Sequence, residues 1–310
     1  MEKKAIRVAY GEALVKLGQT NDKVVVLDAD LAAATMTNGF KAAYPDRFFD
    51  CGIAEANMVD MAAGMSTMEL IPFCSTFAVF AGRNYDQIRN GVCYPKFNVK
   101  FGFSHAGITL GEDGGSHQAI EDIALMRVLP NMTVFVPSDA NECYQCVEAA
   151  AKIEGPVYIR TGRLAVPQFH ESVDFGFKIG KGEVLREGND IAIIATGLMV
   201  AEAVAAADAL AEKGIHARVV NLCTIKPLDE ELVVKVAKEC GKVITCEEHN
   251  ILGGLGEAVC GVLSEKCPTP VRRIGVNDEF GHSGPAAALL KEFGLSAEHI
   301  VEVAEEFVKA

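Results

Sequence analysis

The sequence predicts an α/β protein with two domains, each a mainly parallel sheet with helices on both faces. Short continuous runs of apolar and β-branched residues, such as KVVVLDAD at 23–30, are typical of strands buried on both faces. Longer amphipathic segments lie between these runs, as expected of parallel strands joined by crossover helices. A glycine- and charge-rich stretch interrupts the alternation after residue 166, and 310 residues suffice for two such units.

The first domain is predicted to span residues 1–166. Its strands are apolar runs that end in polar or glycine residues, and its helices carry apolar residues three and four positions apart. The predicted strands are 23–30, 71–77, 98–107, 132–139 and 155–162, and the predicted helices are 5–18, 55–68, 82–92, 118–129 and 140–153.

Residues 167–189 are predicted to form a linker with a small hairpin, because PQFHESVDFGFKIGKGEVLREGN is rich in glycine and charge. The second domain is predicted to span 190–310. Its long helix, LMVAEAVAAADALAEKG at 198–214, ends at Gly214, as a C-cap glycine would end it. The predicted strands of this domain are 190–197, 217–224, 242–248 and 271–277.

Composition argues against several kinds of partner. A formal net charge of −13 leaves no basic stripe for nucleic acid, and no run of about 18 apolar residues predicts a membrane span. The start of the chain has no apolar stretch followed by a cleavage site. The ten cysteines lie mostly in apolar runs, which is typical of reduced thiols in a cytoplasmic protein. Cys143 and Cys146, the one CxxC pair, lie in a helical pattern and are expected to be buried.

The segment SHAGITLGEDGGSHQ, residues 104–118, holds two histidines and two acids among four glycines. His105 and His117 are 12 residues apart, and no HExxH or paired CxxC accompanies them, so a zinc site is disfavoured. The acids would repel a phosphate, and the P-loop ending is absent. Imidazole and carboxylate groups suit the hydroxyls of a sugar better. On this segment alone, a surface loop with turn glycines is the simpler interpretation.

Polar and aromatic side chains follow three of the predicted strands. Because the carboxyl ends of parallel strands meet at one edge of a sheet, these side chains are expected to lie together. They are Asp28 and Asp30, Phe77 and Phe80, and His105.

Glu55 lies in DCGIAEANM, residues 50–58, at the turn from a short strand into a helix, with apolar neighbours on both sides. Such a carboxylate is usually exposed and offsets the helix dipole. If it is buried instead, desolvation raises its pKa and lets it hold a proton near neutral pH.

Several motifs together resemble the transketolase family. GIAEANM, STFAVFAGRNYDQIRN and SHAGITLGEDGGSHQ resemble its pyrimidine-binding domain, and ATGLMVAEA and EEHNILGGLGEAV resemble its C-terminal domain. The resemblance covers essentially the whole chain, and the GEDGGSHQ string is specific. Beta subunits of 2-oxoacid dehydrogenases and 1-deoxyxylulose-5-phosphate synthase share the architecture but match that string less well.

The resemblance implies chemistry on thiamine diphosphate, in which a two-carbon ketol unit passes from a ketose to an aldose through the cofactor's ylide. Glu55 matches the glutamate that hydrogen-bonds N1′ of the aminopyrimidine, a role that needs a raised pKa. Phe80 matches the aromatic residue that stacks on the pyrimidine, and Phe77 another wall of its pocket. Asp30 and Leu31 match residues beside the thiazolium.

The resemblance also implies substrate contacts. His105 and His117 match histidines that bind and deprotonate donor hydroxyls, and Asp113 matches the acid that binds the acceptor's C2 hydroxyl. Arg160, in YIRTGR, matches an arginine that clamps the substrate phosphate, and Arg7, in AIRVAY, is a candidate for a second.

Three departures from the family pattern bear on the site. Residues 32–34 are alanines where the family often has a phosphate-binding serine, and Arg83 stands where a tyrosine is common. These two changes leave the preference for sugar phosphates open. Glu247, Glu248 and His249 resemble a strand-end EEH and are interpreted as interface or structural groups.

The third departure is the lack of a Gly-Asp-Gly, the motif that opens the diphosphate- and metal-binding segment of the family. Diphosphate and Mg²⁺ or Ca²⁺ need oxygen ligands and backbone donors that this chain does not offer in sequence. The chain therefore resembles the C-terminal half of a split transketolase. A separate N-terminal subunit is expected to supply cofactor diphosphate and metal binding, in an α2β2 assembly.

Three alternatives compete with the interpretation as a transketolase subunit. They are the beta component of a related enzyme that uses a 2-oxoacid, a non-catalytic scaffold subunit, and a serine hydrolase built on Ser116 and His117. The histidine pair favours sugars over 2-oxoacids, and Glu55 in a matching aromatic pocket disfavours a scaffold. The hydrolase is disfavoured because adjacent residues are not expected to bring hydroxyl and imidazole into hydrogen-bond register, and no GxSxG elbow occurs.

Overall fold

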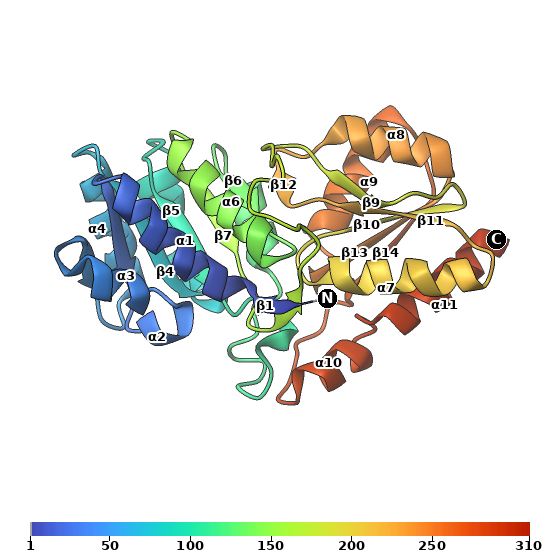
Figure 1. Ribbon diagram of the computed structural model, residues 1–310, viewed down its shortest axis with the longest axis horizontal. Helices are drawn as coiled ribbons and strands as arrows, with labels where there is room; N and C mark the ends of the chain where they lie inside the picture. Colours follow the sequence, from blue (N-terminus) through green and yellow to red (C-terminus); the bar gives the residue numbers. More distant parts are fainter. Residues whose placement is uncertain (1) are drawn as a thin grey trace.

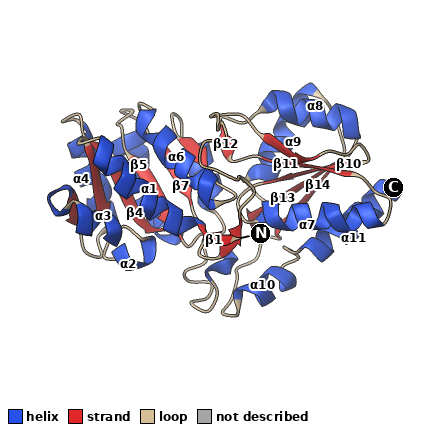
Figure 2. Cartoon of the chain, viewed as in Figure 1, coloured by secondary structure: helices blue, strands red, loops and turns tan. Residues whose placement is uncertain are grey.

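Two mainly parallel sheets organise the chain, as the alternation of elements predicts (Figure 1). The computed structural model describes residues 2–310. Helices cover both faces of each sheet, and the two units lie side by side (Figure 2). No helix among residues 2–310 has the length and apolar character needed to span a membrane.

The first sheet has seven strands in the order β12-β6-β7-β5-β4-β2-β3, all parallel except β12. Its central strands are continuous buried runs, built from valine and leucine in β2 and largely from aromatic and small residues in β4 and β5. The strands are β2 (Val24–Asp28), β3 (Phe48–Asp50), β4 (Ile71–Phe77), β5 (Lys100–Ser104), β6 (Thr133–Phe135), β7 (Val157–Arg160) and β12 (Thr224–Lys226).

Helices α1 and α6 pack together over one face of this sheet, and α4 and α5 cover the other. Asp139 caps α6 by accepting a hydrogen bond from the Glu142 backbone N–H. The helices are α1 (Ile6–Thr20), α2 (Ala32–Thr35), α3 (Asn38–Ala43), α4 (Glu55–Ser66), α5 (Asp122–Val128) and α6 (Ala140–Lys152), with short turns η1 (Pro45–Arg47), η2 (Ala78–Asn84), η3 (Gln87–Cys93) and η4 (Ile108–Leu110).

The second sheet has five strands in the order β14-β13-β10-β11-β9, of which only β9 is antiparallel. Helix α7 ends at Glu212, and Gly214 follows with a left-handed φ of 79°, which confirms the predicted stop. The strands are β9 (Glu183–Arg186), β10 (Ile191–Ala195), β11 (Ala217–Asn221), β13 (Val243–Asn250) and β14 (Val271–Val276), and the helices are α7 (Met199–Glu212), α8 (Glu230–Cys240), α9 (Leu255–Lys266), α10 (Ala286–Glu292) and α11 (Ala297–Lys309).

The two units are interlocked by strands. β12 follows β11 in the chain but pairs with β6 of the first sheet. The hairpin predicted within 167–189 is wrong, because the two strands near this stretch pair elsewhere. β8 (Ala165–Pro167) pairs with β1 (Lys3–Ala5), and β9 forms the edge of the second sheet. A linker that joins two sheets satisfies its backbone hydrogen bonds with both of them.

Two predicted helices are shorter or different in kind. The helix predicted at 82–92 is a 3₁₀ turn followed by the π-helical turn η3, in a stretch whose Gly82, Asn84 and Gly91 have low α-helical propensity. The helix predicted at 118–129 begins only at Asp122. The residues before it are held by other contacts, since Ala119 forms a bridge to Ala106.

The CxxC prediction is confirmed. Cys143 and Cys146 are both fully buried on α6, and burial raises the pKa of both thiols. The Cys146 Sγ lies 3.4 Å from the Sγ of Cys223, which belongs to the second unit, so the pair fills the junction between the units as small apolar groups do.

Candidate active site

The side chains predicted to share one edge of the first sheet do lie together. The Phe77 ring at the end of β4 stacks on the His105 ring, which follows β5, with centroids 4.0 Å apart. Phe77 is parallel to Phe80 at 6.1 Å, and Phe80 meets the edge of the His117 ring at 5.9 Å. β4 and β5 are parallel neighbours, which is why residues distant in sequence meet here.

His105 is held rigidly and is neutral near pH 7. Its backbone φ of 58° is unusual for a residue other than glycine, and its Nδ1 lies 2.9 Å from the Ser104 Oγ. Burial, followed by the positive charges of Arg7 and Arg163, lowers the pKa of His105 to about 4. A neutral imidazole with one nitrogen free of protein contacts can accept a hydrogen bond or a proton from a hydroxyl.

His117 is half-buried, and its Nδ1 lies 3.0 Å from the Ser116 Oγ. The expectation that adjacent serine and histidine side chains fail to reach each other is therefore wrong. Within residues 2–310, no acid contacts the other nitrogen of His117, so the third member of a hydrolase triad is missing. Asp113 is exposed in the same loop, between the two histidines.

Glu55 is the first residue of α4, and only 5% of it is exposed. Its carboxylate receives no hydrogen bond from any side chain or backbone group of residues 2–310. Since α4 packs against η2, which contains Phe80, the carboxylate and the aromatic wall belong to neighbouring elements. The residue is mostly covered, but its carboxylate oxygens are not among the fully enclosed polar atoms without a partner, so they remain accessible and free to bind a ligand.

The segment after β2 divides into a structural acid and a strained turn. Asp28 is fully buried and accepts hydrogen bonds from Leu31 N, Thr35 Oγ1 and Thr37 Oγ1, so it is a structural group. Asp30 is exposed with a φ of 62°, and Leu31 beside it is half-buried. The turn costs backbone energy, which is common at ligand sites.

Arg160 does not have the predicted role. Its side chain is 6% exposed and makes a buried ion pair with Asp122, with Nε 2.7 Å from Oδ2. Its Nη2 also donates to the backbone carbonyls of Ala119 and Glu248. Because these acceptors hold Nε and Nη2 and the side chain is almost fully buried, Arg160 is a structural group and not an exposed phosphate clamp.

Arg163, three residues later, is the more exposed arginine of YIRTGR. Its side chain is 40% exposed, and its positive charge contributes to lowering the pKa of both His105 and Arg7. Arg7 donates to the Ala34 carbonyl at 2.7 Å but forms no ion pair within residues 2–310, and its Nε is buried without a partner. Arg163 donates to the Leu110 carbonyl at 2.6 Å and pairs with Glu112 at 3.3 Å, so these two nearby positive charges, of which only Arg7 is incompletely satisfied, form a candidate anion site.

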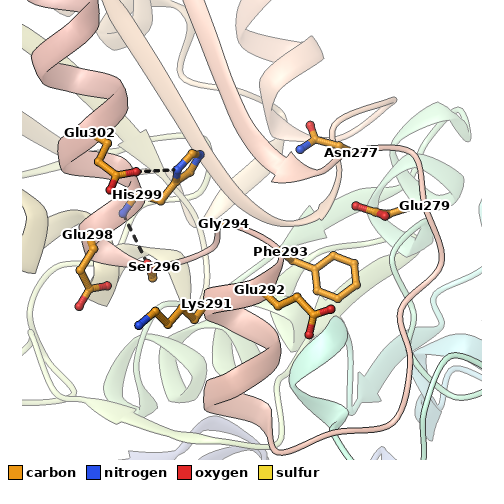
Figure 3. A pocket seen from close by; sticks show the side chains of 10 residues that line it. All are labelled: Asn277, Glu279, Lys291, Glu292, Phe293, Gly294, Ser296, Glu298, His299 and Glu302. Carbon is orange, nitrogen blue, oxygen red and sulfur yellow. Dashed lines mark hydrogen bonds and ion pairs between the residues drawn. The ribbon is translucent and has the colours of Figure 1, made fainter.

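A separate hollow of about 350 Å³ lies in the second unit, between the end of β14 and α10–α11 (Figure 3). Acidic side chains dominate its lining, and the single histidine, His299, is paired with Glu302 at 3.5 Å. No lining residue comes from the first unit, so this hollow is not the site at the edge of the first sheet. The ten lining residues are labelled in Figure 3.

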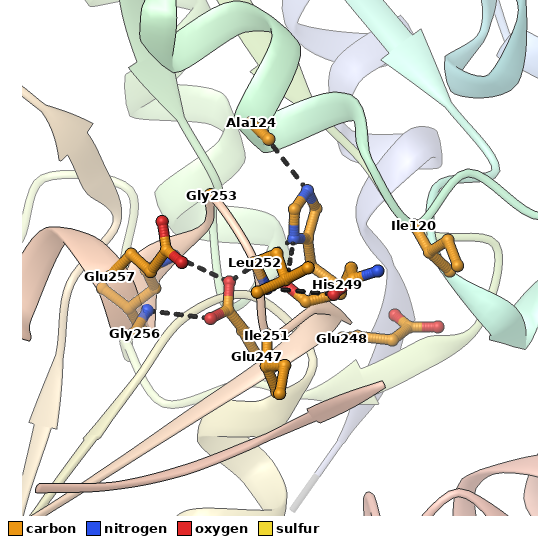
Figure 4. A network of polar contacts seen from close by, with 12 residues as sticks. Ile120, Ala124, Glu247, Glu248, His249, Ile251, Leu252, Gly253, Gly256 and Glu257 are labelled. Atoms are coloured by element: carbon orange, nitrogen blue, oxygen red, sulfur yellow. Dashed lines mark hydrogen bonds and ion pairs between the residues drawn. The ribbon is translucent and has the colours of Figure 1, made fainter. Parts of the chain in front are cut away.

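The EEH residues are buried structural groups at the junction of the two units, as expected (Figure 4). Glu247 accepts hydrogen bonds from Leu255 N and Gly256 N at the start of α9, and burial raises its pKa to about 7. His249 Nε2 accepts from Ala124 N at 3.2 Å. Glu248 points to the opposite side of β13 from Glu247, as strand alternation requires (Figure 4).

Metal binding finds no support within this chain. Among residues 2–310, no three His, Cys, Asp or Glu side chains come together as metal ligands would. The described residues instead offer an aromatic wall, a buried carboxylate, two histidines and two arginines.

Comparison with known proteins shows two family matches that together cover most of the chain. Residues 2–168 match the family described as "Transketolase, pyrimidine binding domain", and residues 180–300 match "Transketolase, C-terminal domain".

Three similar proteins have nearly the same length as this chain. A "Putative transketolase C-terminal section" from Methanocaldococcus jannaschii is 47% identical, over 99% of this chain and 97% of that protein. A "6-deoxy-6-sulfo-D-fructose transketolase subunit SqwH" from Clostridium sp. is 43% identical, over 99% and 95%. A solved structure described as "Split gene transketolase, inactive beta4 tetramer" superimposes with a TM-score of 0.91 at 53% identity, covering 99% of both chains. By contrast, the chain spans 49% of the transketolase of Rattus norvegicus.

Proposed function

This chain belongs to the transketolase family, as the C-terminal subunit of a split transketolase, and we propose that it transfers a two-carbon ketol unit only together with a separate N-terminal subunit. The observation that supports this most strongly is the contiguous array of Phe77, Phe80, His105 and His117, with Glu55 at the start of α4, the helix that packs against η2 and so against the element of Phe80. A donor ketose and an acceptor aldose would bind in turn at this edge of the first sheet.

The described residues fit the aminopyrimidine end of thiamine diphosphate. Bound there, the cofactor would supply a carbanion equivalent and an electron sink for the ketol carbons. Glu55 would hold a proton against a ring nitrogen of the heterocycle, which satisfies its otherwise unpartnered carboxylate. Phe80 and Phe77 would enclose the flat heterocycle and exclude water, and Asp30 and Leu31 would lie nearby.

Substrate binding divides between the histidines and the arginines. His105 is neutral near pH 7 and would accept a hydrogen bond from a donor hydroxyl, while His117 and Asp113 would bind hydroxyls from the rim. Arg7 and Arg163 would bind an anionic group at the far end of the sugar. A phosphate and a sulfonate both present oxygens suited to this pair, and the name of the Clostridium relative refers to a sulfo sugar.

Separate substitutions of Arg163 and Arg160 should distinguish an arginine that binds substrate from one that stabilises the fold. We expect Arg163→Met to raise the KM for a sugar phosphate by about 10- to 100-fold with little change in the melting temperature, because it removes charge-assisted hydrogen bonds to the anion. Arg160→Met should instead lower the free energy of unfolding by about 3 kcal/mol, since it leaves Asp122 buried and unpaired. Steady-state kinetics of the complex and urea unfolding of the chain measure these effects. An unchanged KM in Arg163→Met would contradict the anion site.

An apolar face beside Glu55 supports docking of the partner. Ile53 and Met68 are 77% and 74% exposed, and the half-buried Met61 and Met65 lie between them along α4. Methionine surfaces pack adaptably against a partner. We propose that the N-terminal subunit covers this face and brings the diphosphate and Mg²⁺ or Ca²⁺ ligands to the site, in an α2β2 assembly. The similar split-gene transketolase structure is described as an inactive beta4 tetramer, which agrees with a need for a second kind of subunit.

Measurements of thiamine diphosphate binding test whether the chain needs its N-terminal subunit. We expect the purified chain with Mg²⁺ to bind thiamine diphosphate at least 100-fold more weakly than a mixture with its N-terminal subunit, because it holds only the aminopyrimidine end. Isothermal titration calorimetry with and without the partner measures this difference. Tight cofactor binding and ketose turnover by the chain alone would refute the proposal.

A further inference from the structure

The loop that carries the two histidines, residues 105–118, has only short local turns of its own, closed by hydrogen bonds such as that from Gly114 N to the Gly111 carbonyl. His105, Gly107, Gly111 and Gly114 all have positive φ values, of 58°, 82°, 92° and 78°. The only regular element inside the loop is the short turn η4. A segment of this kind persists only when its surroundings determine its conformation.

Glu248 of the second domain determines the first half of the loop. Its Oε1 accepts a hydrogen bond from Thr109 N at 2.7 Å, across 139 residues of sequence. Gly107 lies so close to the Glu248 carboxyl group that a Cβ at this position would be 2.2 Å from the carboxyl carbon. Glu248 is 3% exposed, so this hydrogen bond is shielded from water.

The second half of the loop is held by residues 277–284, also from the second domain. Gln118 Nε2 donates to the His282 carbonyl at 3.0 Å and to the Ile108 carbonyl at 3.1 Å, so one side chain joins the segment to both ends of the loop. A Cβ on Gly115 would lie 2.3 Å from the Gly281 carbonyl oxygen, so the two backbones are in direct contact there.

Glu248 is itself anchored. Its backbone carbonyl accepts a hydrogen bond from Arg160 Nη2 at 2.9 Å, and Arg160 is fixed by its ion pair with Asp122. Burial raises the pKa of the Glu248 carboxyl group, although the Arg160 charge opposes this effect. The backbone N–H of Thr109 is the one protein donor to this carboxylate. These contacts form a continuous path from the first sheet through β13 to the loop.

We infer that the second domain positions the substrate-binding loop, with Glu248 as a positioning residue for His105 and His117. Glu248 touches neither substrate nor cofactor and acts only through the loop backbone. The inference that the loop is positioned stands on the contacts alone, whereas its consequence for sugar binding rests on the proposed function. The two parts are therefore tested separately.

The structural part is tested by hydrogen–deuterium exchange on the purified chain, without partner or cofactor. In Glu248→Ala, amides of 105–118 should exchange at least 10-fold faster, while those of α4 (55–66) should stay unchanged. Glu247→Ala is the matched control, because Glu247 is an equally buried acid on the same strand whose hydrogen bonds go to α9. Glu247→Ala should accelerate amide exchange in 255–266 and leave the amides of 105–118 protected. Unchanged protection of 105–118 in Glu248→Ala, or equal loss there in Glu247→Ala, overturns the inference.

Two milder variants keep the test decisive if Glu248→Ala does not fold. Glu248→Gln retains an oxygen acceptor for Thr109 N and should restore most of the protection. Gln118→Met removes the amide nitrogen that donates hydrogen bonds to the Ile108 and His282 carbonyls. It should again accelerate amide exchange in 105–118. Protection equal to that of the unmodified chain in Gln118→Met counts against the inference.

The functional part is measured on the reconstituted complex. Glu248→Ala should raise the KM for a donor ketose at least 10-fold and leave the Kd of thiamine diphosphate within 2-fold, while Glu247→Ala should leave that KM unchanged. A general structural defect would weaken cofactor binding as well, and this result would overturn a positioning role. If the unmodified complex turns over no ketose, the proposed function fails, while the exchange data still decide whether the loop is positioned.

Discussion

Replacing Glu55 by Gln is expected to lower kcat of the reconstituted complex by about 10²- to 10⁴-fold, the usual contribution of a positioned proton donor or acceptor. The amide preserves the shape of the side chain but cannot exchange a proton with a ring nitrogen of the heterocycle. Cofactor affinity should change only a few-fold, since the aromatic wall of Phe77 and Phe80 remains. Stopped-flow or coupled assays at saturating ketose measure kcat, and calorimetry measures binding.

The same change should not destabilise the chain. The Glu55 carboxylate has no hydrogen-bond partner within residues 2–310, so the amide, which has the same shape, breaks no contact that holds the fold together. The melting temperature of Glu55→Gln should equal or exceed that of the unmodified chain, as is common when a group is kept for function rather than stability. Glu212→Gln, at the exposed end of α7 in the second unit, is the control and should alter neither activity nor stability. Full activity in Glu55→Gln would favour the scaffold alternative.

Much of this site could be predicted because it depends on short-range rules. The central strands were predictable from continuous β-branched runs, and parallel pairing then places Phe77 beside His105. Burial of Glu55 was one of two readings of its apolar neighbours, and the structure selects it.

The errors concern side chains whose partners lie far away in sequence. The sequence YIRTGR gives no reason to prefer Arg160 or Arg163 as the substrate-binding residue. In the structure, Arg160 forms an ion pair with Asp122, which lies 38 positions away in the sequence. No local pattern shows this pairing. The hairpin prediction failed for the same reason, because β9 and β8 find partners in different sheets. The role of Glu248 also depends on a contact between units, with Thr109.

His170, in the segment that joins the units, is expected to contribute the largest pH-dependent stabilisation. Its Nδ1 lies 2.9 Å from Asp139 Oδ2, and its Nε2 lies 2.8 Å from Glu183 Oε2. Burial alone would lower the pKa of His170, but the two carboxylates outweigh it and raise the pKa to about 10. The ring therefore carries a positive charge at neutral pH and links the cap of α6 in the first unit to β9 in the second.

The sign of the effect follows from this shift. A histidine whose pKa rises on folding from 6.5 to about 10 gives its full stabilisation below pH 6.5 and loses it as the pH rises towards 10. Glu183 is about half exposed, so screening reduces the effect, and we expect about 3 kcal/mol at pH 6. His170→Gln should lower the free energy of unfolding by that amount at pH 6 and by less than about 1 kcal/mol at pH 10.

Urea unfolding at pH 6, 8 and 10 tests this expectation, with the exposed His216→Gln as the control that should show no difference at any pH. If His170→Gln destabilises the chain equally across this range, the ring contributes packing rather than charge. The Phe175 ring, whose centroid lies 3.7 Å from that of His170, is one such packing partner. The distinction matters for the active site. β9 and α6 hold the two units together, and the loop with His105 and His117 is shaped by contacts across the same junction. Loss of the charge on His170 should therefore loosen the active site before the chain unfolds, and exchange in 105–118 should accelerate above pH 9 more than the intrinsic rate predicts.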